Sequence, residues 1–190
     1  MKFLEGIEGE EIKKAVYHSS LGNRDFYKLA LVGDAVLNLY LVLKFYDKGN
    51  PEEIYAMISE YKSNKALYYA VEELNLKELL VANMNQVSDY IYASMLEAIT
   101  GLIYLKFGLE SAFKFLDEEV FPALERNRGK FRNYWEELRK RERGKIRVSF
   151  YEENGEFVAE IKIKDGIFWG RGKNKKEARN EAAKNALLNK

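Results

Sequence analysis

Apolar residues recur with a helical period along the first two thirds of the chain. They stand at positions i, i+3, i+4 and i+7 of successive segments, which are separated by short breaker sequences such as "LGN", "KGNP" and "KFG". This period is typical of α-helices that bury one face. We therefore expect an all-α domain over residues 1–125. Its helices are expected around residues 9–18, 25–48, 51–61, 63–74, 87–107 and 110–125.

The pattern changes after the polar, basic sequence "ERNRGKFRN", in which we expect a linker over residues 126–131. "NYWEELRKRERG" then has the spacing of a short amphipathic helix that ends near Gly144. "KIRVSFY" and "EFVAEIKIK" alternate apolar and polar residues, "KDG" is typical of a hairpin turn, and "IFWGRG" follows as a third strand. The last segment, "NKKEARNEAAKNALLNK", begins with Asn174 as a predicted N-cap and places alanines on one face. Residues 132–190 are therefore expected to form an α+β domain in the order α-β-β-β-α.

One acidic residue interrupts the apolar segment "YKLALVGDAVLNLY", residues 27–40. Its leucines, Leu31 and Leu39 among them, suit a packed interior, whereas Asp34 in their midst carries a full negative charge. An ionised carboxylate is costly to bury unless it is paired, hydrogen-bonded or bound to a metal. The sequence therefore predicts a partner for Asp34 elsewhere in the chain.

Composition excludes several kinds of site and location. The chain has no cysteine and a single histidine, His18, which excludes disulfides, thiolate metal sites and histidine clusters and favours a reducing cytoplasm. The N-terminal sequence lacks the apolar core of a signal peptide, and no run reaches the ~20 apolar residues of a membrane span. We therefore expect a cytoplasmic protein with no membrane partner.

Charge is unevenly divided along the chain. Residues 1–125 hold 12 Lys and Arg against 20 Asp and Glu, a net charge of −8, whereas residues 126–190 hold 19 against 10, a net charge of +9. A basic module favours a polyanion such as nucleic acid, and an acidic module repels one unless cations intervene. The asymmetry favours nucleic-acid binding combined with a metal ion.

The segment "GRGKNKKEARNEAAKNALL" combines a Gly-x-Gly strand end, two lysines at a helix start and alanines at packing positions. Lys175 and Lys176 stand where the helix dipole favours anions, and Arg179 lies one turn further on the same side. Together with the element order, this segment resembles the double-stranded-RNA-binding domain over about residues 131–190. The resemblance implies that the three side chains grip phosphates across the major groove of A-form RNA. A merely solvated helix face is the alternative interpretation.

Two further positions follow from the same resemblance. "WEELRK" in the first helix of this domain places Glu137 and Lys140 where the family reaches a minor groove of the duplex. The loop between the first two strands is "EENGE", which is acidic and lacks the histidine that the family usually carries there. We therefore expect weak RNA binding from this domain alone.

The helical part carries two further motifs. "AVYHSSLGNRDFYKLALVGDAVLNLY" has a His-x-Ser element ahead of a helix with Gly-Asp-Ala, and "YIYASMLEAITGLIYLKFG" has Glu-Ala followed by Gly and a Tyr-Leu pair. Both resemble the signature of the ribonuclease III family, and the resemblance spans nearly all of residues 9–125. It implies the all-α fold of the ribonuclease III endonuclease domain, followed by the RNA-binding domain.

The usual ribonuclease III pattern has a pair of carboxylates on each of these two helices. Here the first pair reads Ala30 and Asp34 and the second reads Ser94 and Glu97, so that each helix has one carboxylate replaced. The compact Mini-III branch has a small residue and a Ser or Thr at these two places and is a nuclease, although it lacks the C-terminal domain. Two interpretations stay open, an active nuclease and a catalytically silent relative.

Asp34 and Glu97 are the candidate catalytic and metal-binding residues. Mg²⁺ prefers octahedral oxygen coordination and is often held by one or two carboxylates together with water and substrate phosphate. We expect one Mg²⁺, or Mn²⁺ in its place, to polarise the scissile phosphate and to lower the pKa of a bound water. A structural ion pair is the alternative interpretation for each carboxylate. His18 is expected to be a structural hydrogen-bonding residue.

By resemblance we expect a homodimer, whose two sites face opposite strands of one RNA duplex and leave 5′-phosphate and 3′-hydroxyl ends with a short 3′ overhang. Structured ribosomal RNA precursors are the substrates that the family suggests. The first hypothesis is therefore a metal-dependent endoribonuclease that cleaves double-stranded RNA. The alternatives are a silent RNA-binding or ribosome-associated homologue, and a helical interaction domain with a basic tail.

Overall fold

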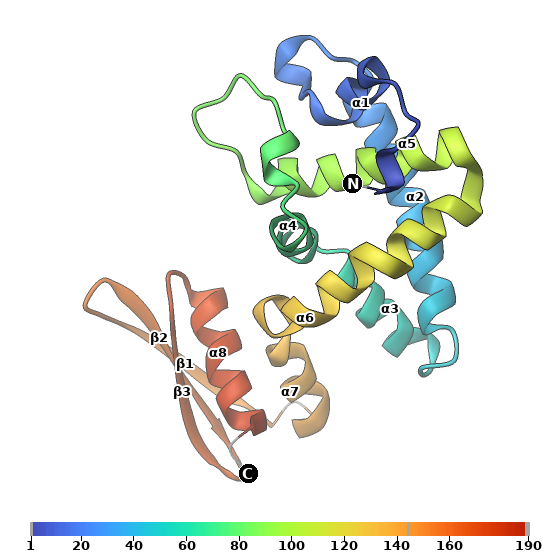
Figure 1. Cartoon of the computed structure of the whole chain (residues 1–190). Helices are drawn as coiled ribbons and strands as arrows, with labels where there is room; N and C mark the ends of the chain where they lie inside the picture. Colours follow the sequence, from blue (N-terminus) through green and yellow to red (C-terminus); the bar gives the residue numbers. More distant parts are fainter. Residues whose placement is uncertain (1, 144, 189–190) are drawn as a thin grey trace. The chain divides into compact units, whose positions relative to one another are not determined.

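A computed structural model describes residues 2–143 and 145–188, which fold as two compact units that meet in sequence between Phe131 and Arg132. The first unit is all-α, and the second packs helices on an antiparallel sheet (Figure 1). This is the expected fold class, an all-α domain followed by an α-β-β-β-α domain, and the prediction is confirmed. Each unit has a hydrophobic core of its own.

The helices of the first unit follow the predicted apolar segments closely, and short 3₁₀ turns and one π-helical turn join some of them. They are α1 (Gly9–Val16), α2 (Phe26–Phe45), α3 (Pro51–Tyr61), α4 (Asn64–Glu73), α5 (Asp89–Phe115) and α6 (Phe121–Phe131). Local sequence sets their starts. Asn50 and Glu53 form a reciprocal capping box ahead of α3, and the Ser63 side chain caps α4.

A glycine divides the longest helix. α5 covers both segments in which we expect helices, 87–107 and the beginning of 110–125, and Gly108 between them has φ +80° and ψ 179°. A left-handed φ of this kind suits glycine because it has no Cβ. Figure 1 shows the chain reversing direction in this region before it continues into α6. The "KFG" breaker therefore acts as expected.

The centre of the first unit is the crossing of α2 and α5 (Figure 1). Gly33 and Gly101 lie at this crossing, where a Cβ on Gly33 would come within 1.8 Å of the Glu97 carbonyl oxygen. A Cβ on Gly101 would come within 2.2 Å of the Leu29 carbonyl oxygen. Only glycine permits this approach of two helix backbones, so Gly33 sets how closely its neighbour Asp34 comes to α5.

Two leucines of α2 differ from expectation. Leu31 is 73% exposed and Leu39 is 43% exposed, although both stand in an apolar segment that suits a packed interior. The helix is apolar on most of its circumference, and the fold covers only the face that contacts α5 and its neighbours. The interior positions on that face, such as Leu37 and Leu41, are buried as expected.

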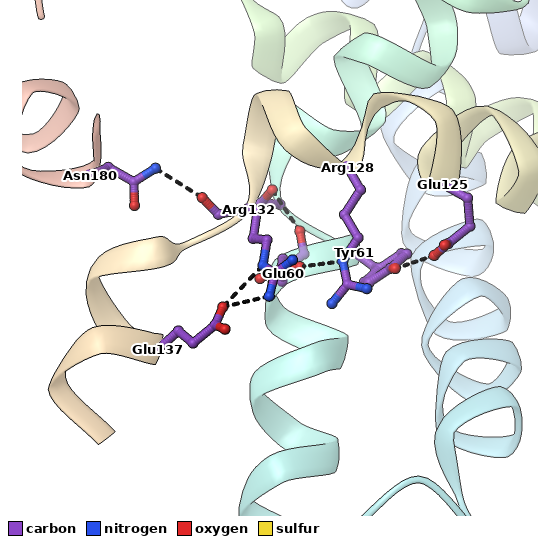
Figure 2. Close-up of polar contacts among 8 residues, drawn as sticks. Glu60, Tyr61, Glu125, Arg128, Arg132, Glu137 and Asn180 are labelled. Carbon is purple, nitrogen blue, oxygen red and sulfur yellow. Dashed lines mark hydrogen bonds and ion pairs between the residues drawn. The ribbon is translucent and has the colours of Figure 1, made fainter. Parts of the chain in front are cut away.

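The linker expected over residues 126–131 is wrong, because these residues form the last part of α6. Asn127 and Phe131 are buried on that helix, and the Arg128 guanidinium pairs with Glu60 at 3.2 Å. Figure 2 shows this pair beside the hydrogen bond that the Tyr61 hydroxyl donates to Glu125. The segment is polar enough to resemble a linker, but two buried side chains and an ion pair hold it on the helical core.

The second unit contains helices and strands in the predicted order. They are α7 (Tyr134–Glu142), β1 (Arg147–Glu153), β2 (Glu156–Ile163), β3 (Gly166–Gly172) and α8 (Lys175–Leu188). The strands pair antiparallel in the order β1-β2-β3, and Ala159 lies opposite both Phe150 and Gly170. Gly144, the expected end of the first helix of this domain, and residues 189–190, the expected end of its last helix, lie outside the described residues.

Helix α8 lies against one face of this sheet. A Cβ on Gly170 would come within 2.1 Å of the Ala182 backbone nitrogen, which shows how closely the helix approaches β3. The alanines of α8 and the alternating apolar residues of β2 form the core, as the pattern predicts. Val158 is an exception. The alternation of side chains along β2 places it on the face of the sheet opposite α8, yet it is only 2% exposed. Tyr151 and Trp169 flank it there.

Helix α2 has the length and composition of a membrane span. The core helix of a globular domain meets the same criteria, and the face of α2 that contacts α5 is buried in the first unit. It therefore gives only weak evidence for a membrane.

Candidate functional site

The crossing of α2 and α5 brings Asp34 and Glu97 together. Burial of Glu97, followed by the negative charge of Asp34 and a hydrogen bond with it, raises the pKa of the Glu97 carboxyl to about 8. Asp34 is more open to solvent, with 39% of its side chain exposed. The structure thus places the candidate residue Glu97 beside Asp34, whereas the ion-pair partner of Asp34 is Lys62.

Lys62 is a third charged group at this crossing, and sequence reasoning did not single it out. It follows directly after α3, and its Nζ lies 2.9 Å from Oδ1 and 3.0 Å from Oδ2 of Asp34. The same ammonium donates to Oδ1 of Asn38 at 3.4 Å, one turn after Asp34 on α2. Its positive charge opposes the rise in the pKa of Glu97. Nothing in the spacing of residues 34 and 62 indicates this contact.

The two positions where the usual family pattern has carboxylates lie inside the fold. Ala30 is 5% exposed and Ser94 is 2% exposed. Across residues 2–143 and 145–188, no three or more His, Cys, Asp or Glu side chains gather as a metal-binding cluster. The acidic part of the site therefore consists of Asp34 and Glu97.

These side chains fit a hydrated divalent cation. Two carboxylates and the Asn38 carbonyl oxygen are hard oxygen donors, which Mg²⁺ and Mn²⁺ prefer, and Mg²⁺ keeps several water ligands in most sites. Burial is the main cause of the raised pKa of Glu97, and the negative charge of Asp34 adds to it. A cation between the two carboxylates would remove the repulsion between them.

His18 has the structural role that the sequence predicts. Its Nδ1 accepts a hydrogen bond from the Ser20 backbone N–H at 3.1 Å, so Nε2 carries the proton and donates to the Tyr27 hydroxyl at 2.9 Å. The ring is only 6% exposed. Tyr27 in turn stacks against Tyr90, with ring centroids 6.4 Å apart. The histidine thus orients an exposed tyrosine on α2, seven residues before Asp34.

The basic candidates lie at the start of α8. Lys175 and Lys176 are exposed in its first turn, and the Asn174 side chain accepts from the Glu177 backbone N–H at 2.9 Å as the predicted N-cap. Arg179 is partly buried, with its guanidinium 4.7 Å from the centre of the Trp135 ring. Its Nε is buried and has no hydrogen-bond partner within the described part of the chain. Lys175 and Lys176 are therefore the more accessible of the three cations.

The two candidates on α7 differ in their surroundings. Lys140 is exposed, whereas the Glu137 carboxylate accepts two hydrogen bonds from the Arg132 guanidinium, at 2.7 and 3.0 Å (Figure 2). The Asn180 side chain donates to the Arg132 backbone carbonyl at 2.9 Å, which ties the start of the unit to α8. The acidic turn between β1 and β2 is tight, with Asn154 and Gly155 both at positive φ.

Comparisons with known proteins agree with both units. A family model described as "Ribonuclease III domain" matches residues 27–108, and one described as "Double-stranded RNA binding motif" matches residues 136–190. Ribonuclease 3 of Oceanobacillus iheyensis is 32% identical over 207 residues, covering 93% of this chain and 89% of the relative. Ribonuclease 3 of Aquifex aeolicus is 25% identical, covering 93% and 88%.

Solved structures show the same fold. The nuclease domain of ribonuclease III from Campylobacter jejuni matches with a TM-score of 0.58 and 22% identity, over 65% of this chain and 90% of that one. Dicer from Pichia stipitis matches with a TM-score of 0.51 and 22% identity, over 96% and 94%. These likenesses show the fold of the helical unit.

Proposed function

This chain belongs to the ribonuclease III family, and from that premise we propose that it is a metal-dependent endoribonuclease that cleaves double-stranded RNA. The observation that carries the proposal is the meeting of Asp34 and Glu97 where α2 crosses α5. Both residues lie within the part of the chain that matches the ribonuclease III domain. The unit that matches the RNA-binding motif supplies a way to hold the substrate.

In the proposed reaction Asp34 and Glu97 hold the metal ion, and Asn38 offers a neighbouring oxygen. Bound Mg²⁺ or Mn²⁺ supplies positive charge at the scissile phosphate and lowers the pKa of a water. Glu97 must release its proton to act as a ligand, which its raised pKa makes harder in the metal-free site. We expect products with 5′-phosphate and 3′-hydroxyl ends and a short 3′ overhang.

Contacts with the duplex are proposed for the second unit. Lys175 and Lys176 project from the first turn of α8, where the helix dipole also favours phosphate. Arg179 reaches the same side from its position over Trp135, and α7 presents Lys140 and Glu137. Contacts of this kind read the shape and the 2′-hydroxyls of A-form RNA rather than a base sequence. We therefore propose specificity for double-stranded RNA.

The exposed leucines of α2 support a homodimer. Leu31, Leu39 and Leu43 are 73%, 43% and 57% exposed, and they follow the four-residue spacing of one side of the helix. Exposed apolar residues that lie in line commonly mark a protein interface. We propose that this side of α2 pairs with a second copy, so that each subunit contributes one Asp34 and Glu97 site for opposite strands.

We also propose that the protein acts in the cytoplasm in the processing of ribosomal RNA. Its support is the absence of cysteine, the net positive charge of residues 126–190 and the membership of the ribonuclease III family. Structured precursor RNA offers duplex segments of the kind that this site would cleave.

A catalytically silent RNA-binding homologue is the second candidate. It is favoured by the absence of a carboxylate at Ala30 and Ser94 and by the ammonium of Lys62 on Asp34. Such a protein would keep the basic face of α8 and bind duplex RNA without cutting it.

The deciding experiment incubates the whole protein with long duplex RNA and Mg²⁺ or Mn²⁺. We expect cleavage by the wild type, loss of about 10²-fold or more in rate for Asp34→Asn and Glu97→Gln, and wild-type cleavage by Asp47→Asn. Asp47 is an exposed aspartate and provides a matched control. Tight duplex binding with no cleavage at any metal concentration would favour the silent homologue. Failure to bind duplex at low salt would leave only a helical interaction domain.

A further inference from the structure

Lys62 contacts two of the side chains that the proposed function assigns to a cation, Asp34 and Asn38. Its Nζ contacts both carboxylate oxygens of Asp34, at 2.9 and 3.0 Å, and the Asn38 carbonyl oxygen at 3.4 Å. The ammonium therefore engages the oxygen donors that α2 offers to the site. A compact ammonium with three donors is suited to such a place, because it can contact several oxygens in different directions.

The contact differs from the surface ion pairs of the same unit. Only 24% of the Lys62 side chain is exposed, whereas Lys44 in its pair with Asp117 is 35% exposed and Lys28 in its pair with Asp25 is 75% exposed. Lys62 also influences a second acidic group, because its charge opposes the rise in the pKa of Glu97. It thus interacts with both carboxylates of the candidate site, one from each crossing helix.

The charges of the site suggest what this lysine does. With Asp34 and Glu97 ionised and Lys62 protonated, the local charge is −1, which can attract a divalent cation but binds it weakly. A phosphate brought to the site adds negative charge and competes with Asp34 for the ammonium. A side chain with flexible methylenes, at the end of α3, can turn from one oxygen to the other.

We infer that Lys62 is a further catalytic residue, which holds Asp34 and Asn38 in the free enzyme and binds a non-bridging oxygen of the scissile phosphate when metal and duplex enter. This inference rests on the proposed function. Lys62 forms and breaks no covalent bond and keeps its proton throughout. In the hydrolysis, water would form the new bond to phosphorus and lose one proton, the bond from phosphorus to the 3′ oxygen would break, and the leaving 3′ oxygen would gain one proton to become the 3′-hydroxyl.

Two effects of a substitution at Lys62 have opposite sign, and together they distinguish a catalytic lysine from a structural ion pair. Removing the ammonium frees Asp34 and Asn38 for the metal, so the affinity for Mn²⁺ in the absence of RNA should rise by about 3- to 10-fold. The same change removes a charged donor from the phosphate, so cleavage at saturating Mn²⁺ should slow by about 10²-fold. A lysine that merely ties α3 to α2 would raise the Mn²⁺ affinity when removed, but its loss would not slow cleavage at saturating Mn²⁺.

The experiment compares Lys62→Met and Lys62→Gln with the wild type and with Lys44→Met. Lys44 pairs with Asp117 on the same unit and provides a matched loss of a lysine ion pair. Mn²⁺ binding is measured by electron paramagnetic resonance without RNA, and cleavage is measured in single turnover at saturating Mn²⁺. Circular dichroism confirms that each variant is folded, and the two substitutions at position 62 protect the test against the misfolding of either one.

We expect tighter Mn²⁺ binding together with slower cleavage in both Lys62 variants and wild-type values in Lys44→Met. Lys62→Arg keeps the charge and should recover about tenfold of the lost rate. Either effect without the other, or neither, would overturn the inference. If the wild type cleaves and the Lys62 variants cleave equally well, only the role of Lys62 fails. If the wild type cleaves nothing, the proposed function fails and the catalytic role falls with it.

Discussion

Glu97 is the carboxyl group whose chemistry its surroundings alter most. Burial and the neighbouring Asp34 raise its pKa from 4.5 to about 8. Ser94, three residues earlier on the same helix, is buried and carries no charge. A single glycine contact, Gly33 against the Glu97 backbone, brings these groups within reach of α2. At the residue scale the site therefore depends as much on small side chains as on the acidic ones.

The raised pKa predicts a pH-dependent stability. Between pH 4.5 and about 8 the folded metal-free protein keeps the Glu97 proton while the unfolded chain releases it, so the free energy of unfolding falls as pH rises through this window. The amide in Glu97→Gln does not titrate, so this variant does not show that fall in the free energy of unfolding. In chelator, its melting temperature relative to the wild type should therefore rise by on the order of 10 °C between pH 5 and pH 9.

Thermal unfolding followed by circular dichroism measures this gain. Glu110→Gln, the same substitution at an exposed position of α5, should run parallel to the wild type across the whole range. Parallel curves for Glu97→Gln as well would contradict the assignment of a raised pKa to Glu97.

At the scale of elements, α8 combines two tasks. Its alanines pack against the sheet where Gly170 and Gly172 leave room, and its first turn exposes Lys175 and Lys176. The packing orients the helix and the N-cap Asn174 starts it, so that the lysines project from its dipole-positive end. An element that is structural on one face can therefore bind an anion at its end.

We predict that Lys175→Ala with Lys176→Ala weakens duplex binding and reduces its salt dependence. Each lost phosphate contact should lower the slope of log affinity against log salt by about 1, or about 2 for the pair. The measurement uses the full chain carrying Asp34→Asn, with duplex RNA at several salt concentrations. Lys184→Ala, a lysine of α8 that pairs with Glu181, should leave the slope unchanged. An unchanged slope in the double variant would exclude these lysines from the interface.

At the scale of the whole molecule, two units of different charge serve one proposed reaction. The acidic helical unit carries the candidate metal-binding carboxylates and the basic unit carries the candidate RNA contacts. The exposed leucines of α2 lie on the same helix as Asp34, so pairing through them would place two sites near one interface. Cleavage of both strands of a duplex requires two such sites.

The homodimer has a direct test in the mass of the protein in solution. Light scattering after gel filtration should give about 44 kDa, twice the chain mass of 22.2 kDa. Leu31→Glu with Leu39→Glu should shift the protein toward 22.2 kDa, because two charges would be buried without partners at the interface. Ile167→Glu, at an exposed apolar residue of the second unit, should leave the mass unchanged. A wild type that elutes as a monomer would contradict the dimer.

The sequence alone predicts most of the fold, because helical period and strand alternation are local signals. The breaker at Gly108, the cap at Asn174 and the strands of the second unit can all be read from neighbouring residues. The segment 126–131 misleads because its polar composition resembles a linker, while long-range contacts of Asn127 and Phe131 make it a helix. The helical period of the apolar residues likewise does not indicate that Leu31 is exposed in the folded unit.

For the candidate site as well, the sequence predicts one part and the tertiary structure decides the other. The resemblance of two motifs to the ribonuclease III signature indicates Asp34 and Glu97 from the sequence alone, since each stands in a recognisable helical segment. Tertiary structure decided what surrounds them. Only the packing of α3 beside α2 places Lys62 on Asp34, and only the meeting of α2 and α5 buries Glu97 beside Asp34, which raises its pKa. The reason is physical: local pattern determines which elements form, whereas charge interactions depend on distances between elements far apart in the chain.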